Sequence, residues 1–207
     1  MKNIRIAIQS RGRLAEPSQE YLKTLGITFS PIGRNCMATC SSKNIDVLFL
    51  RDDDIPEYVE RGVADFGIVG ENVLLEKRVR VNLVKRLGFG RCSIVISVPV
   101  KSDINLVTQL KDMRIATSYP DILRQFLQIQ NVTAEIIEIK GSAEIAPSLN
   151  LADAICDLTQ SGRTLKENNL RTLCTIFESQ AVLIQTPYAV NQDAAESQST
   201  FLNTLAS

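Results

Sequence analysis

Short apolar runs recur along the chain and alternate with segments that have helical spacing. The runs are four to seven residues long and rich in Ile, Val and Leu, which is typical of buried strands. They lie at 4–8, 46–50, 66–69, 92–98, 114–117, 135–139, 154–158 and 181–185. The alternation predicts an α/β protein with mainly parallel sheets, because the helices between strands supply the crossovers that parallel pairing needs.

The intervening segments carry signals that start and stop helices. A helix is expected over 16–25, and another over 55–61, with Asp54 as its N-cap and Gly62 as its stop. Further helix starts are expected at Asn72, at Pro120 and in the polar tail after residue 191. A glycine-rich step at 88–90 indicates a crossover between two lobes.

The predicted division is discontinuous. Lobe I takes residues 1–89 and 178–207, and lobe II takes residues 90–177. Each lobe is expected to hold its own sheet flanked by helices, with a ligand in the cleft between them. No repeat at a fixed period and no low-complexity segment interrupts this arrangement.

Charge and composition narrow the class of protein. Lys+Arg and Asp+Glu are equal at 23 each, so no global field attracts nucleic acid or anionic lipid. The first residues read as a strand rather than a signal peptide, and no apolar run is long enough to span a membrane. We therefore expect a cytoplasmic protein that binds neither nucleic acid nor membrane.

The residue inventory excludes several kinds of catalysis. The chain has no histidine, which removes Ser-His-Asp and Cys-His mechanisms and most zinc hydrolase sites. Its five cysteines form no CxxC pair, and Cys36 with Cys40 has no second pair to complete a zinc site. Any chemistry must come from carboxylates, arginines, hydroxyls, backbone dipoles or a bound ion.

The segment from Asp157 to Glu167 is the most informative stretch. An apolar strand ends in the turn Thr159-Gln-Ser-Gly-Arg-Thr164, and a helix is expected directly after it. Exposed N–H groups, hydroxyls and an arginine suit a dianionic phosphate, and Asp157 is placed to hold a sugar hydroxyl or a metal-bound water. Thr164 with Glu167 also fits a capping box, so the residues alone leave a phosphate site and a well-capped helix equally open.

Polar clusters follow four other predicted strands. They are Gln9-Ser-Arg-Gly-Arg-Leu14, Arg51-Asp-Asp-Asp54, Gly70-Glu-Asn72 and Ser118-Tyr119. Taken singly, each has an ordinary explanation as a surface turn, a helix cap, a loop carboxylate or a packed aromatic. Because ligands of open α/β sheets bind at the carboxyl ends of strands, their shared placement raises the expectation of a site.

At these residues the chain resembles the ATP phosphoribosyltransferase family, which opens histidine biosynthesis. The similarity runs from about residue 4 to 186. Its segments are Gly12-Arg-Leu14, Leu50-Arg-Asp-Asp-Asp-Ile-Pro56, 62–74, 87–92, 114–120, 141–147 and 151–165. The resemblance implies a two-lobed fold like that of periplasmic binding proteins. It also implies Mg²⁺-dependent transfer of the phosphoribosyl group of phosphoribosyl pyrophosphate (PRPP) to N1 of the adenine of ATP.

The resemblance also implies roles for individual residues. Arg13 and Arg34 would be catalytic and face the pyrophosphate. PRPP would be bound by Asp157, Thr159, Ser161, Gly162, Arg163 and Thr164. ATP or pyrophosphate would be bound by Arg11, Gly12, Asp54, Glu71, Arg91 and Tyr119, and Mg²⁺ would be held mainly by substrate phosphates.

The family has a long form with a C-terminal histidine-sensing domain and a short form. The length of this chain favours the short form, which implies a homodimer or larger assembly and a separate regulatory subunit resembling histidyl-tRNA synthetase. A truncated long form remains an alternative, as does a non-catalytic two-lobed module that binds a solute or nucleotide, because a fold alone does not specify catalysis.

Overall fold

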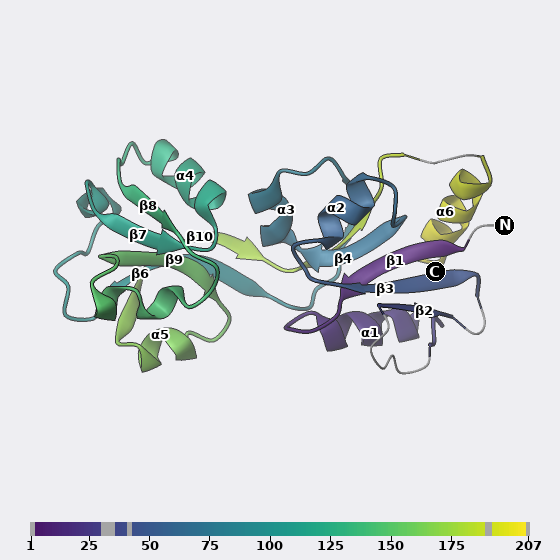
Figure 1. Ribbon diagram of the computed structural model, residues 1–207, viewed down its shortest axis with the longest axis horizontal. Coiled ribbons are helices and arrows are strands. Elements are labelled where there is room, and N and C mark those ends of the chain that lie inside the picture. The colour runs from purple at the N-terminus through teal and green to yellow at the C-terminus, as the bar shows by residue number, and fades with distance from the viewer. Residues whose placement is uncertain (1–2, 30–35, 41–42, 189–191, 206–207) are drawn as a thin grey trace. The chain divides into compact units, whose positions relative to one another are not determined.

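The computed structural model describes residues 3–29, 36–40, 43–188 and 192–205. The chain forms two compact units, one of residues 1–90 with 180–207 and the other of residues 91–179. Each unit has its own sheet (Figure 1). None of the described helices is long and apolar enough to cross a bilayer.

The first unit is built on a six-stranded sheet with the order β2-β3-β1-β4-β11-β5. Its strands are β1 Ile4–Gln9, β2 Met37–Thr39, β3 Ile45–Leu50, β4 Phe66–Gly70, β5 Asn82–Arg86 and β11 Ala181–Gln185. Its helices are α1 Ala15–Thr24, α2 Ile55–Glu60, α3 Glu71–Lys77 and α6 Gln192–Thr204. Alternate side chains of the central strands enter two separate cores, as period-2 strands require.

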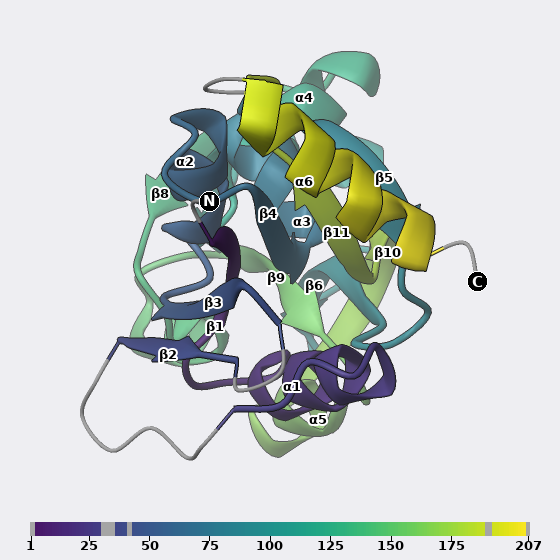
Figure 2. The same ribbon diagram turned by 90° about the vertical axis from the view of Figure 1, so that its right-hand side faces the viewer.

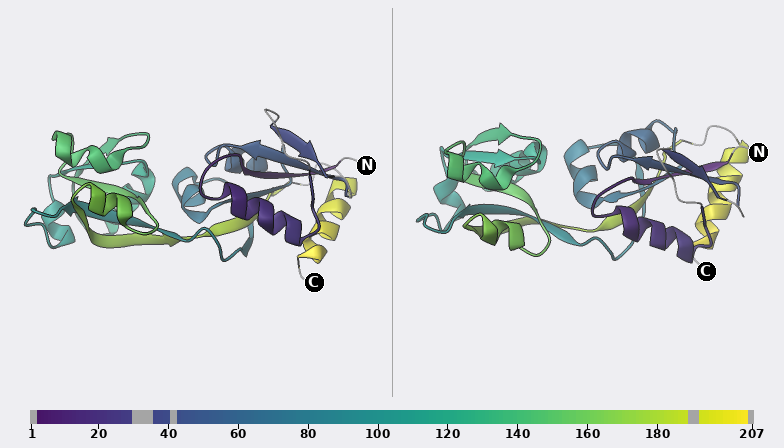
Figure 3. Two further views of the ribbon diagram at one scale, coloured as in Figure 1. Left: turned by 90° about the horizontal axis from the view of Figure 1, so that it is seen from below. Right: turned by 60° about the horizontal axis from the view of Figure 1, so that its bottom comes forward.

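The two cores of this unit lie on opposite faces of the sheet. Ile6, Ile8 and Phe66 pack with residues of α1 and α6, both visible on the face seen from below in Figure 3. Ala7 and Val69 pack instead with residues of α2 and α3. Figure 2 shows α6 beside the strands that it covers, where Phe201 lies 4.6 Å from Phe66 between ring centroids.

The second unit has a five-stranded sheet with the order β10-β6-β9-β7-β8. The strands are β6 Cys92–Pro99, β7 Arg114–Thr117, β8 Glu135–Glu138, β9 Ala154–Thr159 and β10 Leu170–Ser179. The helices are α4 Pro120–Ile129 and α5 Arg163–Glu167, with the 3₁₀ turns η1 Val107–Leu110, η2 Ala143–Ile145 and η3 Pro147–Leu149. α4 and α5 lie on opposite sides of this sheet (Figure 1).

The α/β class is confirmed, but the prediction of mainly parallel sheets is wrong. In the first unit β1 pairs in parallel with β3 and β4, while β2, β5 and β11 pair antiparallel. In the second unit β7 pairs in parallel with β8 and β9, while β6 and β10 pair antiparallel. Both sheets are mixed because antiparallel strands extend the parallel ones: β5, β6, β10 and β11 lie next to the boundary between the units in sequence, and β2 pairs with β3, the next strand of the chain.

Helix positions follow the predictions more closely than helix caps do. Asp54 occupies the N-cap position of α2, but its side chain makes no capping hydrogen bond. Asn72 lies inside α3, whose N-cap is Gly70. α4 begins at Pro120 as predicted, where proline costs no backbone hydrogen bond.

Candidate functional site

Parallel pairing brings the predicted polar clusters to one edge within each unit. In the first unit Gln9 pairs with Leu50 and Ala7 with Gly67, so the segments after β1, β3 and β4 start at the same edge. In the second unit Thr117 pairs with Cys156, which places Tyr119, just beyond β7, at the same edge as Asp157, near the end of β9. The two edges are therefore separate candidate sites, one in each unit.

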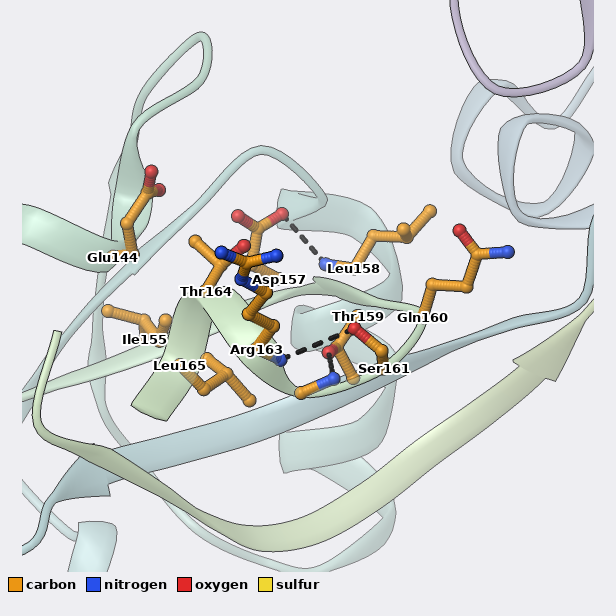
Figure 4. A pocket seen from close by; sticks show the side chains of 11 residues that line it. Glu144, Ile155, Asp157, Leu158, Thr159, Gln160, Ser161, Arg163, Thr164 and Leu165 are labelled. Atoms are coloured by element: carbon orange, nitrogen blue, oxygen red, sulfur yellow. Dashed lines mark hydrogen bonds between the residues drawn. The ribbon is translucent and has the colours of Figure 1, made fainter. Parts of the chain in front are cut away.

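The candidate site of the second unit is the segment from the end of β9 to the first turn of α5, residues 157–164, which we call the phosphate loop. It lines a pocket of about 380 Å³ together with Glu144, Ile155 and Leu165. Figure 4 shows the lining side chains around the strand end and the start of the short helix. Asp157 and Thr159 are half-buried, whereas Ser161, Arg163 and Thr164 are exposed and open to a ligand.

Side chains and a glycine set the backbone of the phosphate loop. The Gly162 N–H donates to Thr159 Oγ1 at 3.0 Å, and the Arg163 N–H donates to Ser161 Oγ at 3.4 Å (Figure 4). Gly162 has a φ of +72°, a left-handed conformation that favours glycine, and no atom lies within 4 Å of where its Cβ would be. The space beside the loop is thus clear for a ligand to approach the backbone.

The start of α5 presents hydrogen-bond donors. Among the hydrogen bonds of the described residues, the backbone N–H groups of Thr164 and Leu165 have no acceptor. First-turn N–H groups of a helix carry a partial positive charge and suit an anion. Together with the hydroxyls of Ser161 and Thr164, they form a concave set of neutral donors.

The expected capping box is absent from this helix. α5 begins at Arg163 with Gly162 as its N-cap, two residues earlier than a Thr164 cap would allow. Glu167 instead pairs with Arg163, whose Nε donates to its Oε1 at 2.8 Å. The Thr164 hydroxyl is therefore not committed to capping.

Asp157 has a pKa well above the ordinary value of an aspartate. Burial raises the pKa of its carboxyl to about 6, and the nearby Glu144 carboxylate adds to this effect. The Leu158 N–H donates to Asp157 Oδ1 at 2.8 Å and partly offsets the rise in pKa. The Asp157 carboxylate thus ionises close to neutral pH, in a pocket that also contains backbone and hydroxyl donors.

The candidate site of the first unit is the segment from Ser10 to Leu14, which we call the arginine turn. It connects β1 to α1, and Arg13 donates from Nη1 to the carbonyl oxygen of Gly90. Arg13 also acts electrostatically on Asp52: burial and Asp53 raise the pKa of the Asp52 carboxyl, and Arg13 lowers it. The guanidinium of Arg13 therefore binds a backbone carbonyl and lies within electrostatic range of Asp52.

The remaining predicted residues lie around these two sites. Arg11 and Asp54 are exposed, and Glu71 is engaged by Arg86, whose Nη2 donates to Glu71 Oε1 at 2.5 Å. Arg91 is exposed at the start of the second unit, and Tyr119 precedes α4, its N–H donating to Thr117 Oγ1 at 2.8 Å. Arg34 lies outside the described residues.

Two residues of these sites carried no functional prediction. Glu144 lines the pocket of the phosphate loop from η2, thirteen positions earlier in the chain, and only tertiary structure reveals it. Gln9 ends β1 and is buried at 8% exposure. Its signal in the sequence was a polar residue closing an apolar strand directly before the arginine turn.

Comparison with known proteins decides the family. A family model described as ATP phosphoribosyltransferase matches residues 51–207. The chain belongs to the ATP phosphoribosyltransferase family. It is 48% identical over 184 residues to the ATP phosphoribosyltransferase of Cytophaga hutchinsonii, a match covering 89% of this chain and 64% of that relative. The protein of the same name from Maricaulis maris is 42% identical over 189 residues, covering 88% and 64%.

Solved structures agree with this family and with the predicted fold. The ATP phosphoribosyl transferase (HisG:HisZ) complex from Thermotoga maritima contains a chain with a TM-score of 0.82 and 32% identity, with 98% of this chain and 96% of that chain covered. The alkanesulfonate-binding protein SsuA from Xanthomonas axonopodis has a TM-score of 0.62 at 15% identity. That likeness shows the periplasmic-binding-protein fold, as predicted. The chain spans about two thirds of the length of the curated relatives named above.

Proposed function

We propose that this protein transfers the phosphoribosyl group of PRPP to N1 of the adenine of ATP, releasing pyrophosphate, as the first step of histidine biosynthesis. The observation that carries the proposal is the phosphate loop: a pocket with backbone and hydroxyl donors and two half-buried carboxylates, Asp157 and Glu144, in a chain of the ATP phosphoribosyltransferase family. Phosphate and ribose are adjacent in PRPP, as donors and carboxylate are adjacent here.

In this proposal the phosphate loop binds the ribose 5-phosphate part of PRPP. The N–H groups of Thr164 and Leu165 and the hydroxyls of Ser161 and Thr164 donate to the phosphate oxygens. Ionised Asp157 accepts a hydrogen bond from a ribose hydroxyl, and this fixes the orientation of the sugar. Arg163 adds charge at the rim, where solvent screening limits its contribution.

The arginine turn is assigned to the anionic leaving group. Adenine N1 already has a free lone pair, so attack on the anomeric carbon needs no general base. This agrees with a chain that has no histidine. What the reaction needs is stabilisation of the charge that develops on departing pyrophosphate, which a preorganised guanidinium supplies. Arg13 is the candidate, with Arg11 and Gly12 beside it.

In this proposal Mg²⁺ binds together with the substrate, mainly through the substrate phosphates. Mg²⁺ is usually bound through one or two carboxylates, waters and substrate phosphates rather than a full protein cage. The described residues contain no group of three or more acidic or thiol side chains arranged as such a cage, whereas Asp157 and Glu144 line one pocket. When bound, the ion neutralises pyrophosphate charge; Asp157 and Glu144 are the residues that would contact its waters.

We further propose that the protein assembles with a regulatory subunit similar to the HisZ component of the Thermotoga maritima complex. Such a subunit would place the catalytic chain under feedback control by histidine. Size-exclusion chromatography with light scattering, of the chain alone and mixed with a HisZ-like subunit from the same genome, measures this directly. Co-elution supports the assembly, and separate elution at micromolar concentrations contradicts it.

The transfer itself is tested by mixing the protein with ATP, PRPP and Mg²⁺, with and without that subunit, and following the near-ultraviolet absorbance of phosphoribosyl-ATP. The expected result is product and pyrophosphate in equal amounts. Binding of both substrates without turnover in either mixture would instead support a non-catalytic binding module. Turnover with free bases in place of ATP would indicate a different acceptor.

A further inference from the structure

Gln9 is a buried polar side chain at the junction of β1 and the arginine turn. It is 8% exposed, and its Oε1 accepts a hydrogen bond from the Leu14 N–H at 2.7 Å. Leu14 is the N-cap residue of α1, and its own side chain cannot cap the helix. The Gln9 amide therefore accepts a hydrogen bond from the Leu14 N–H at the start of α1, and this bond links the two ends of the turn.

The turn between these two residues is closely fitted to the Gln9 side chain. Gly12 has a φ of +114°, and a Cβ built there would lie 2.8 Å from Gln9 Nε2. The Ser10 N–H donates to the Leu50 carbonyl at 2.7 Å, and the Ala15 N–H donates to the Gly12 carbonyl at 3.1 Å. The backbone thus wraps over the Gln9 amide, and both ends of the turn are fixed.

Arg13 directly precedes Leu14, whose N–H donates to Gln9 Oε1. Its guanidinium donates to the Gly90 carbonyl, and Leu14, the next residue, is buried at 2% exposure. The direction of the Arg13 side chain therefore depends on the backbone at 13 and 14, which the hydrogen bond between Gln9 and Leu14 holds.

From this geometry we propose that Gln9 is a positioning residue for Arg13, which sets the direction of the guanidinium toward pyrophosphate. The identity of the ligand, pyrophosphate, rests on the proposed function, whereas the contacts of Gln9 do not depend on it. Gln9 acts through Arg13 without touching the substrate. A purely structural role would lower stability but would leave the contribution of Arg13 unchanged.

The test is a double-mutant cycle between Gln9→Leu and Arg13→Ala. Leucine keeps approximate volume and removes the acceptor, whereas Gln9→Glu keeps an acceptor for the Leu14 N–H. Gln109→Leu is the matched control, because Gln109 Oε1 likewise accepts backbone N–H groups, from Asn105 and Leu106 at 2.7 and 2.9 Å, in the other unit. Titration of pyrophosphate by calorimetry and steady-state kinetics supply the two readouts.

We expect Gln9→Leu to weaken pyrophosphate binding about tenfold and to have no further effect once Arg13 is alanine, since residues acting as a unit are non-additive. Gln9→Glu should recover most of the loss, Gln109→Leu should leave binding unchanged, and ribose 5-phosphate binding should be unaffected in every variant. Equal losses in both Arg13 backgrounds, or no recovery with glutamate, would overturn the proposal. If the leucine variant does not fold, Gln9→Met replaces it in the cycle.

A ligand-free measurement separates this inference from the proposed function. In a ¹⁵N spectrum, the Arg13 Nε–H resonance would be assigned by its absence in Arg13→Ala. This resonance should move in Gln9→Leu, return toward its original position in Gln9→Glu and stay in place in Gln109→Leu. A resonance that does not respond to Gln9 refutes positioning, whereas wild-type protein without transferase activity refutes only the proposed function.

Discussion

The phosphate loop and the arginine turn both follow a parallel strand, yet they are built in opposite ways. The phosphate loop is formed within eight consecutive residues, is open around Gly162 and keeps N–H donors without acceptors among the described hydrogen bonds. The arginine turn depends on distant residues: Arg13 binds the carbonyl of Gly90, and Asp52 lies within its electrostatic reach. One site is a set of exposed backbone and hydroxyl donors, and the other is a charge held in place by tertiary contacts.

The comparison teaches that the two sites should respond differently to mutation. Changes in the phosphate loop remove ligand contacts and leave packing intact, because most of its functional side chains are exposed. Changes around the arginine turn disturb a fitted structure.

Replacement of Arg13 should have the largest effect on turnover. Arg13→Ala removes the guanidinium assigned to the leaving group, and loss of such a preorganised group costs roughly 10²–10³ in kcat. Arg61→Ala is the matched control, because Arg61 is an exposed arginine of the same unit that pairs with Glu57 on α2. Steady-state kinetics of both variants, with circular dichroism as a fold check, gives the answer; near-normal turnover of Arg13→Ala removes it from the mechanism.

Replacement of Asp157 should separate activity from stability. Asp157→Asn loses the ionised acceptor for a ribose hydroxyl, so kcat/KM for PRPP should fall about tenfold or more, as for a hydrogen bond to a charged group. The same binding should weaken in the wild type as pH falls below about 6, where Asp157 becomes protonated. A pH profile of kcat/KM that is identical in wild type and Asp157→Asn would contradict this role.

Asp157→Asn should be more stable than the wild type at neutral pH, although its activity should fall. The pKa of Asp157 in the folded state is about 6, above its ordinary value of 3.8, so the ionised carboxylate destabilises the folded protein as pH rises through this window. Asparagine removes that cost, which is at most on the order of 3 kcal/mol above pH 6 and vanishes below pH 4. Urea unfolding at pH 4 and pH 7.5 measures it; equal differences at both pH values would exclude the ionisation cost.

Glycine replacements compare the packing of the two sites. A Cβ at Gly90, where φ is +61°, would overlap Leu14 Cδ2 and approach Arg13 Nη1 to 3.1 Å, whereas a Cβ at Gly162 meets open space. Gly90→Ala should therefore cost about 2–4 kcal/mol of stability from backbone strain plus overpacking. Gly162→Ala should cost only about 1 kcal/mol from strain. Denaturant unfolding of both variants tests the difference, and equal costs would mean that the arginine turn is no more closely packed than the phosphate loop.

The smallest expected effect is at the exposed rim of the phosphate loop. Arg163 is 83% exposed and pairs with Glu167, so its charge is screened by solvent. Arg163→Ala should raise KM for PRPP only about threefold, as screened charge interactions are typically worth less than 1 kcal/mol. Lys166→Ala, on the same helix but outside the pocket lining, should leave KM unchanged. A hundredfold effect at Arg163 would show that it contacts phosphate directly.

The sequence predicted the local parts of this molecule and missed those that depend on packing. The apolar runs that became β1, β4, β7, β9 and β11 were recognised because burial on both faces leaves a clear signal. β5 has mostly exposed side chains at a sheet edge, and β10 contains register shifts between Thr172 and Cys174 and between Thr175 and Phe177. Neither shows the regular alternation that predicts a strand.

The same distinction applies to the sites. The phosphate loop was recognisable because its donors are contiguous in sequence, although the Thr164 capping box was wrong, since α5 begins two residues earlier than that cap would allow. The roles inferred for Gln9 and Glu144 depend on contacts that only the folded chain creates. Side-chain capping by Asp54 failed for a related reason, because a helix start is compatible with several hydrogen-bond arrangements.

The central claim is that the phosphate loop recognises ribose 5-phosphate and the arginine turn recognises pyrophosphate. The most direct test is calorimetric titration of these two ligands into wild type, Arg13→Ala and a Ser161→Ala/Thr164→Val double variant. We predict that the double variant loses ribose 5-phosphate binding and keeps pyrophosphate binding, and that Arg13→Ala does the reverse. Loss of both ligands in either variant, or of neither in both, would contradict the assignment.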